Sequence, residues 1–176
     1  KDILFRSERT GWGHYYHYDG EGRLKNVITS GPWVAGQVAA IDTVGRTIYL
    51  YGFGREKGVD PYYYMLYKAS IDKEGVTLLT PENAQHGVSF LSSKRYFVDT
   101  YSRVDMEPKI VLRNNQGKMI IELAKPDTRR LKELGWRAPE RFTVKAADGL
   151  TDIYGIMWKP ADFDPNKKYP IISSVY

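Results

Sequence analysis

The sequence contains no cysteine. Disulfides, zinc–thiolate sites and a cysteine nucleophile are therefore excluded. It also lacks any stretch of about 18 consecutive apolar residues, so no segment is expected to cross a membrane as a helix. No run of five like charges occurs, and bases alternate with acids, as in Arg6-Ser7-Glu8-Arg9. The net charge of +5 therefore does not indicate a nucleic-acid partner.

Aromatic residues are abundant. They make up 14% of the chain, and fourteen of them are tyrosines. Tyrosine favours half-buried positions in β-sheets, where its ring packs and its hydroxyl reaches water. Apolar residues at 42% and charged residues at 27% are typical of a folded globular protein. We therefore expect a mainly β protein.

Short apolar runs separated by turn residues predict an antiparallel meander over the first 124 residues. The turns are marked by acidic or amide residues followed by glycine, at 19–22, 72–75 and 114–117. The predicted strands are 3–6, 14–18, 27–29, 38–41, 47–51, 62–70, 76–80, 88–90, 96–101, 109–113 and 119–123.

An internal repeat refines this prediction. Residues 15–31 have the same layout as residues 66–82: an aromatic strand, an acidic-glycine turn, an aliphatic strand and a threonine. Thr29 and Thr80 are 51 residues apart, and a fainter third copy covers 109–123. Repeats of roughly 40–50 residues with four strands each are typical of β-propeller blades. We expect about two full blades, with further blades upstream.

The character of the sequence changes after residue 124. Residues 127–136 predict a short helix that ends at Gly135. Residues 141–150 and 151–160 read as two strands joined by a turn at Asp148-Gly149. The apolar run at 171–176 is suited to a strand in a larger sheet. Because the chain begins and stops in strand-like runs, it is expected to be an excised fragment.

These segments together resemble the dipeptidyl peptidase IV-like branch of the prolyl oligopeptidase superfamily. The stretch from Arg141 to Tyr176, with its FDPNKKYP segment, is similar to the family's entry into its hydrolase domain. The stretch SERTGWGHYYHYD at 7–19 resembles a blade strand of the family, and residues 27–42 and 83–102 resemble its last two blades.

The resemblance implies antiparallel four-stranded propeller blades followed by the first strands of an α/β-hydrolase domain. The implied boundaries are 1–124 for the C-terminal blades, 125–140 for a helical connector and 141–176 for the truncated start of the catalytic domain. The implied activity of the full-length parent is that of a serine-type dipeptidyl peptidase releasing X-Pro and X-Ala dipeptides. The Gly-x-Ser-x-Gly elbow of such enzymes is absent here, so this chain is expected to be inactive alone. The alternative is a non-catalytic propeller module that binds peptides or sugars.

Tyr176 is the candidate catalytic residue. The resemblance places at this position a tyrosine whose hydroxyl helps form the oxyanion hole, while nucleophile, aspartate and histidine lie beyond the chain. His14, His17 and His86 are expected to be blade histidines bonded to the backbone, with His86 in a loop. Tyr62-Tyr63-Tyr64 is interpreted as part of an aromatic strand, the alternative being an exposed stacking platform for sugar or peptide.

Neither a cofactor nor a metal site is expected. The implied partners are peptides with penultimate proline or alanine, and a second copy of the chain, through open sheet edges or as a dimer of the parent. Export from a bacterial cell is the expected localisation.

Overall fold

The computed structural model describes residues 1–175, which form two compact units, Lys1–Pro126 and Asp127 onward. Each unit is described by itself. Among the described residues, no helix has the length and apolar character needed to cross a bilayer.

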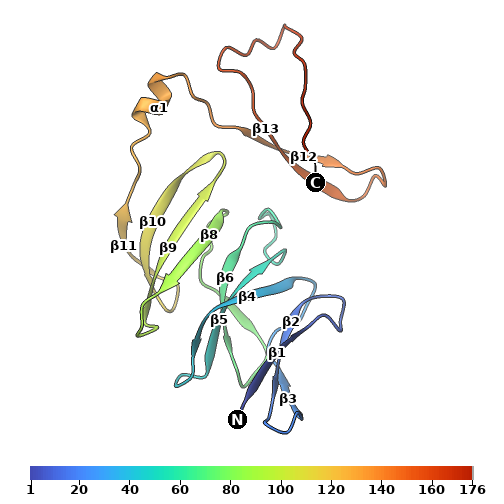
Figure 1. Ribbon diagram of the computed structural model, residues 1–176, viewed down its shortest axis with the longest axis vertical. Helices are drawn as coiled ribbons and strands as arrows, with labels where there is room; N and C mark the ends of the chain where they lie inside the picture. The colour runs from blue at the N-terminus through green and yellow to red at the C-terminus, as the bar shows by residue number, and fades with distance from the viewer. Residues whose placement is uncertain (176) are drawn as a thin grey trace. The chain divides into compact units, whose positions relative to one another are not determined.

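The first unit consists of three antiparallel sheets in which each strand pairs with the next along the chain (Figure 1). The two four-stranded sheets confirm that part of the sequence prediction, and a three-stranded sheet precedes them. The first sheet contains β1 (Ile3–Ser7), β2 (His14–Tyr18) and β3 (Leu24–Val27). The second contains β4 (Val34–Asp42), β5 (Thr47–Phe53), β6 (Met65–Ser70) and β7 (Val76–Leu78). The third contains β8 (Gln85–Phe90), β9 (Tyr96–Arg103), β10 (Met106–Asn114) and β11 (Met119–Ala124).

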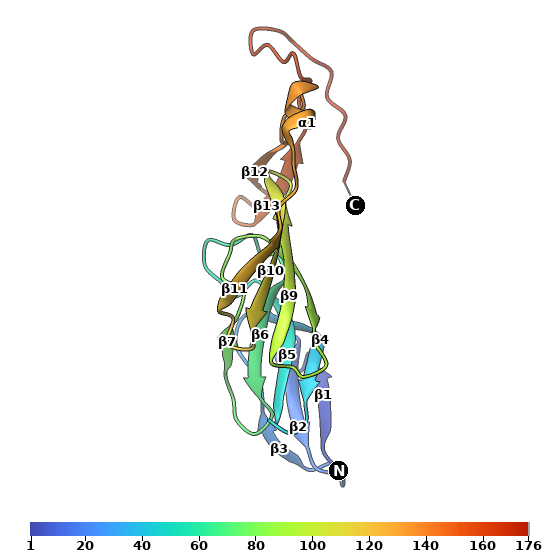
Figure 2. The ribbon, with the colours of Figure 1, turned by 90° about the vertical axis from the view of Figure 1, so that its left-hand side faces the viewer.

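The second sheet is covered on both faces. Within this unit the sheets follow one another, with β2 in contact with β4, and β8 in contact with β4 and β6 (Figure 2). One core cluster joins the first and second sheets around Trp33 and Tyr67, and another joins the second and third around Tyr49 and Phe97. Burial of these large rings is the main stabilising term for the stack.

The repeated threonines perform the same task in two sheets. The Tyr15 N–H donates to the Oγ1 of Thr29 at 3.0 Å, and the Leu66 N–H donates to the Oγ1 of Thr80 at 2.8 Å. Both hydroxyls are buried. Each satisfies a backbone donor where the outer strand has left the ladder, which explains why the repeat keeps a threonine there.

The predicted strand at 62–70 begins three residues too early. The N–H groups of Tyr62 and Tyr63 donate to Oδ1 and to the carbonyl oxygen of Asp60, both at 3.0 Å. This turn at Asp60-Pro61 uses the donors that a ladder would need, so Tyr62–Tyr64 lie in the connection before β6.

An ion-pair cluster on the surface joins the first two sheets. Arg46 donates to Asp2 at 2.9 Å and to both carboxylate oxygens of Asp72 at 2.6 Å. Hydrogen bonds from His17 and then Arg46 hold the pKa of Asp2 well below its usual range. Hydrogen bonding to Arg46 likewise lowers the pKa of Asp72. Both carboxylates are therefore bound in their charged form.

We expect this cluster to contribute stability that is lost in acid. Because both carboxyl groups bind protons less readily in the folded chain, their contribution is complete above the unfolded pKa of about 3.9 and falls below it. The urea midpoint of the wild-type chain should drop as the pH is lowered from about 5 to about 3. Arg46→Gln, which removes the arginine from both carboxylates and leaves Asp2 with His17, should make that drop smaller. An equal drop of the urea midpoint in the variant would show that Arg46 does not stabilise the charged forms of Asp2 and Asp72.

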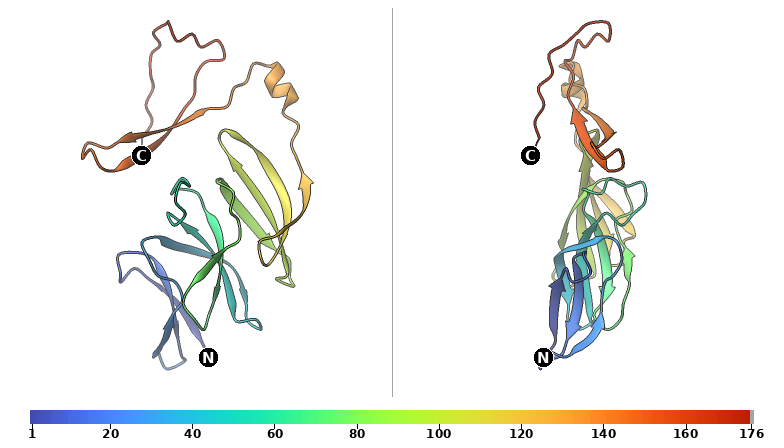
Figure 3. Two further views of the ribbon diagram at one scale, coloured as in Figure 1. Left: turned by 180° about the vertical axis from the view of Figure 1, so that it is seen from behind. Right: turned by 90° about the vertical axis from the view of Figure 1, so that its right-hand side faces the viewer.

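The second unit contains α1 (Arg129–Glu133), β12 (Glu140–Lys145) and β13 (Asp152–Met157), seen from behind in Figure 3. The predicted helix and hairpin are confirmed, with Gly149 at a φ of 69° in the turn. The strand predicted at 171–176 is wrong for the described residues 171–175, which lie outside any strand. Ile171 and Ile172 are 90% and 96% exposed. No described strand pairs with this run, and an apolar run becomes a strand only with a neighbour.

Candidate functional site

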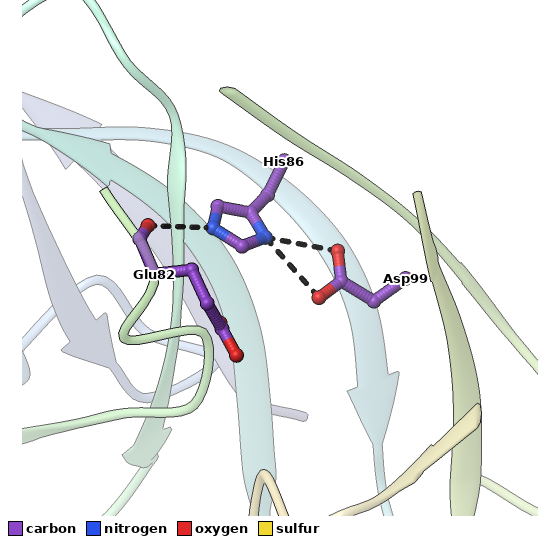
Figure 4. Close-up of side chains that lie close together, drawn as sticks. All are labelled: Glu82, His86 and Asp99. Atoms are coloured by element: carbon purple, nitrogen blue, oxygen red, sulfur yellow. Dashed lines mark hydrogen bonds and ion pairs between the residues drawn. The ribbon is translucent and has the colours of Figure 1, made fainter. Parts of the chain in front are cut away.

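The described residues carry one concentrated group of buried ionisable side chains, within the third sheet. His86 lies on β8, Asp99 on β9 and Arg113 on β10, and Glu82 precedes β8. His86, Asp99 and Arg113 are each at most 2% exposed. Figure 4 shows the imidazole of His86 between Asp99 and Glu82.

The side chains of this cluster are bonded to one another. The Nδ1 of His86 is 2.9 Å from Oδ1 of Asp99, and its Nε2 is 3.0 Å from the carbonyl oxygen of Glu82. Arg113 donates from Nε to Oδ2 of Asp99 at 2.9 Å and from Nη2 to Oε1 of Glu82 at 2.7 Å. Its Nη1 donates to the carbonyl oxygen of Gly117 at 3.1 Å.

The imidazole of His86 lies between two acceptors, the carboxylate of Asp99 and the carbonyl oxygen of Glu82. Arg113 contacts the carboxylates of both Asp99 and Glu82, so a positive charge accompanies them inside the sheet, as buried carboxylates require. Tyr101 stacks on the ring of His86 with centroids 5.2 Å apart and shields it from water.

Burial and pairing act in opposite directions on the charged and polar groups here. Burial lowers the pKa of Arg113, but hydrogen bonds and charge from Glu82 and Asp99 outweigh it and raise the pKa above its usual value. Burial raises the pKa of the Tyr101 hydroxyl. The guanidinium and the phenol both keep their ordinary protonation at neutral pH.

The geometry does not provide for nucleophilic catalysis. A histidine oriented by an aspartate is half of a hydrolytic triad, but the triad's histidine must present its other nitrogen to a hydroxyl. Here that nitrogen faces the Glu82 carbonyl, and the ring is 1% exposed. A substrate cannot reach it, so the pair holds β8 to β9.

A metal ion fits this cluster poorly. Glu82, His86 and Asp99 offer ligand atoms within 4.8 Å of one another. However, the guanidinium of Arg113 already binds an oxygen of each carboxylate. A metal ion placed here would face that fixed positive charge. The carboxylates that could bind a metal ion are therefore already paired with Arg113 in an internal salt bridge.

The other two histidines lie on β2. His14 is bonded to the backbone as expected, with Nε2 2.8 Å from the carbonyl oxygen of Gly31. His17 instead contacts side chains, with Nδ1 3.1 Å from Oδ1 of Asn26 and Nε2 3.1 Å from Asp2. The expectation of a backbone partner is therefore wrong for His17.

The expectation that His86 lies in a loop was wrong, because the residue lies on β8. The expected backbone bond is present, from Nε2 to the carbonyl oxygen of Glu82, while Nδ1 faces the carboxylate of Asp99. The sequence did contain a signal for this cluster. Asp99 has the same strand parity as Phe97 and Tyr101, which places a carboxylate on the core face of a predicted strand. Tyr176, the candidate oxyanion-hole residue, lies outside the described residues.

Comparisons with known proteins point to one family. Residues 1–108 match the family model described as "Dipeptidyl peptidase IV (DPP IV) N-terminal region". A probable dipeptidyl peptidase 4 of Trichophyton verrucosum is 25% identical over 175 residues, covering 97% of this chain and 23% of the relative. Human dipeptidyl peptidase 8 is 27% identical over 169 residues, covering 85% of this chain and 17% of the relative.

Solved structures share the fold. Dipeptidyl peptidase 4 of Porphyromonas gingivalis matches with a TM-score of 0.75 and 23% identity, over 96% of this chain and 24% of that one. A putative dipeptidyl aminopeptidase IV of Bacteroides ovatus matches with a TM-score of 0.75 and 22% identity, over 96% and 26%. The chain thus spans about a quarter or less of the length of these proteins.

Proposed function

The chain belongs to the dipeptidyl peptidase IV N-terminal region family, and on that basis we propose that it is part of a serine exopeptidase that releases N-terminal X-Pro and X-Ala dipeptides. The observation that carries this proposal is the extent of the match. The family model covers residues 1–108, while the alignment with a probable dipeptidyl peptidase 4 covers 97% of the chain. The likeness therefore continues past the family model into the second unit.

In this proposal residues 1–124 form the last blades of the propeller. Residues 125–140 connect these blades to the α/β-hydrolase domain, which begins with residues 141–176. The division of the chain after Pro126 supports the first boundary. The hairpin of β12 and β13 supports the start of a new sheet at about residue 141. The buried cluster around Asp99 then has a structural role in the last blade.

Tyr176 is the residue of this chain assigned to the chemistry. Its hydroxyl would donate to the oxygen of the scissile carbonyl as negative charge develops there. The serine, aspartate and histidine that complete the reaction belong to the part of the longer protein beyond Tyr176. The isolated chain holds the donor without the nucleophile, so it is inactive in this proposal.

The test compares the isolated chain with the longer protein. The purified 176-residue chain should give no turnover of a chromogenic Gly-Pro amide above buffer. The longer protein should hydrolyse it and lose activity after reaction with a serine-directed phosphonate. Phosphonate-sensitive activity that persists in the repurified short chain would contradict the domain assignment. Inactivity of the longer protein would instead favour a binding module.

A further inference from the structure

The connection between β5 and β6, residues 54–64, is not explained by the proposed function. It has eleven residues and is the longest connection between strands of the first unit, whereas β9 and β10 are joined by only two. Long ordered connections in compact domains commonly carry binding functions. We call this segment the 54–64 loop.

Side-chain bonds from β6, from the start of β8 and from the residue Asn83 before it hold the 54–64 loop in place. Asn83 donates from Nδ2 to the carbonyl oxygen of Gly58 at 3.1 Å, and the N–H of Tyr64 donates to Oε1 of Gln85 at 2.9 Å. The hydroxyl of Tyr67 donates to Oε1 of Glu56 at 3.0 Å. A loop fixed in this way loses little conformational freedom when a ligand binds.

The buried cluster supports this arrangement. Asn83 lies just before β8 and Gln85 is the first residue of that strand, so both lie between Glu82 and His86 in the sequence. The carboxylate of Glu82 is held by Arg113, and its carbonyl oxygen lies 3.0 Å from Nε2 of His86. The cluster therefore fixes the backbone from which Asn83 and Gln85 reach the loop.

The loop presents aromatic rings to solvent. Tyr62 is 72% exposed and Tyr64 is 45% exposed, although both are large and partly apolar. The ring of Tyr64 stacks on Phe53 with centroids 5.4 Å apart and lies 5.9 Å from Tyr51. The ring of Tyr64 is held by these contacts, and that of Tyr62 lies two residues away in the same turn. Exposed tyrosines offer a flat face and a hydroxyl, the combination that many binding surfaces use.

A recess of about 340 Å³ includes a residue of the same loop. It is lined by Arg55 of the loop and by Ser30, Gly31, Pro32 and Trp33. The guanidinium of Arg55 lies 5.9 Å from the ring of Trp33 and 5.6 Å from that of Tyr67. Trp33 is only 3% exposed, and Nη1 of Arg55 donates to Oε1 of Glu56 at 2.6 Å. The recess therefore offers the ring of Pro32 to an apolar group and the remaining N–H groups of Arg55 to a peptide carbonyl.

The loop lies at the end of the first unit from which the chain leaves. The N–H of His86 donates to the carbonyl oxygen of Tyr64, so β6 and β8 begin side by side. In the antiparallel third sheet, the start of β8 and the end of β11 lie at the same end (Figure 1). The chain continues from β11 towards the segment proposed to open the catalytic domain.

We propose that the 54–64 loop, through Tyr62 and Tyr64 and the recess at Arg55, binds the part of a peptide substrate that follows the released dipeptide. This inference rests on the proposed function. The ligand is a polypeptide, because the loop combines flat aromatic faces for proline and apolar side chains with a donor for backbone carbonyls. The loop would favour long peptides over substrates that end just after the dipeptide.

The experiment uses the longer protein and its Tyr62→Ala/Tyr64→Ala double variant, with Tyr96→Ala as control. Tyr96 is an exposed tyrosine at the start of β9, whereas the end of β9 pairs with the start of β8 beside the loop. Two substrates are compared: a chromogenic Gly-Pro amide and a ten-residue peptide that begins with Gly-Pro. The double variant should lose about tenfold in kcat/KM on the decapeptide, mainly through KM, and keep its value on the amide within about twofold. The control should change neither.

The outcomes separate the loop from the catalytic proposal. Equal losses on both substrates, or no loss on either, would overturn the inference. If the longer protein cleaves neither substrate, the proposed function fails, and the loop is tested by the anisotropy of a fluorescent decapeptide. Weaker binding to the double variant would still support the loop, and equal binding would overturn it. An oligosaccharide that binds through the loop in place of the decapeptide would also overturn it.

Discussion

Tyr176→Phe in the longer protein should lower kcat by about 100- to 1,000-fold, the usual loss for one oxyanion-hole donor. The substitution keeps the ring and removes only the hydroxyl. A donor that acts on charge developing in the transition state contributes little to binding the neutral carbonyl of the substrate. We therefore expect kcat and kcat/KM to fall almost equally while KM changes little.

The matched control is Tyr96→Phe, which removes a hydroxyl from a partly exposed tyrosine on β9. Its kcat on the Gly-Pro amide should equal that of the parent. If Tyr176→Phe also keeps kcat within about threefold, Tyr176 has no part in the mechanism. Steady-state kinetics of the two variants, measured beside the parent, distinguish the two cases.

Asp99→Asn should destabilise the first unit by about 3–5 kcal/mol, the usual cost of removing one partner from a buried ion pair. Asp99 is fully buried and binds both His86 and Arg113. Asparagine has nearly the same shape as aspartate, so the loss of unfolding free energy measures the effect of removing the negative charge. Urea unfolding of the 176-residue chain, followed by tryptophan fluorescence, measures it.

The control for Asp99→Asn is Glu21→Gln, which breaks the pair of Glu21 with Arg23. Both side chains are more than 70% exposed. An exposed pair of this kind contributes about 0–1 kcal/mol, so its unfolding free energy should barely change. Comparable losses in the two variants would show that burial does not set the strength of the Asp99 cluster.

The meander could be predicted from sequence because its signals are local. Alternating apolar residues and the Gly-containing turns predicted eleven strands in the first unit, although the strand expected at 27–29 ends at Val27 and begins at Leu24. Tyr62–Tyr64 show the limit of local signals, because three aromatic residues in a row favour a strand. In the structure, the N–H groups of Tyr62 and Tyr63 instead donate to Oδ1 and to the carbonyl oxygen of Asp60. Competition for hydrogen bonds decided that boundary.

The repeat was also visible, because Thr29 and Thr80 occupy equivalent positions, each 14 residues after the residue whose N–H it accepts from. The buried cluster was not predicted, since its members are up to 31 residues apart. His86 and Arg113 can both bond to Asp99 only because β9, which carries Asp99, lies between β8 and β10. Register across a sheet brings such residues together, and a single sequence gives only the strand parity of each one.

The strand expected at 171–176 illustrates a third case. Its apolar residues are suited to a buried position in a sheet, yet Ile171 and Ile172 are exposed. Local preference supplies only part of the stability of a strand, and hydrogen-bonded neighbours supply the rest. The hairpin of β12 and β13 forms because both partners are close in sequence.

The most direct test of the central claim is the product formed from a peptide that begins with X-Pro. The longer protein is incubated with such a peptide, and the products are identified by mass spectrometry. We expect loss of the first two residues as one dipeptide, with the remainder intact and no cleavage when the second residue is neither proline nor alanine. Release of single amino acids, internal cleavage, or an unchanged peptide would contradict it.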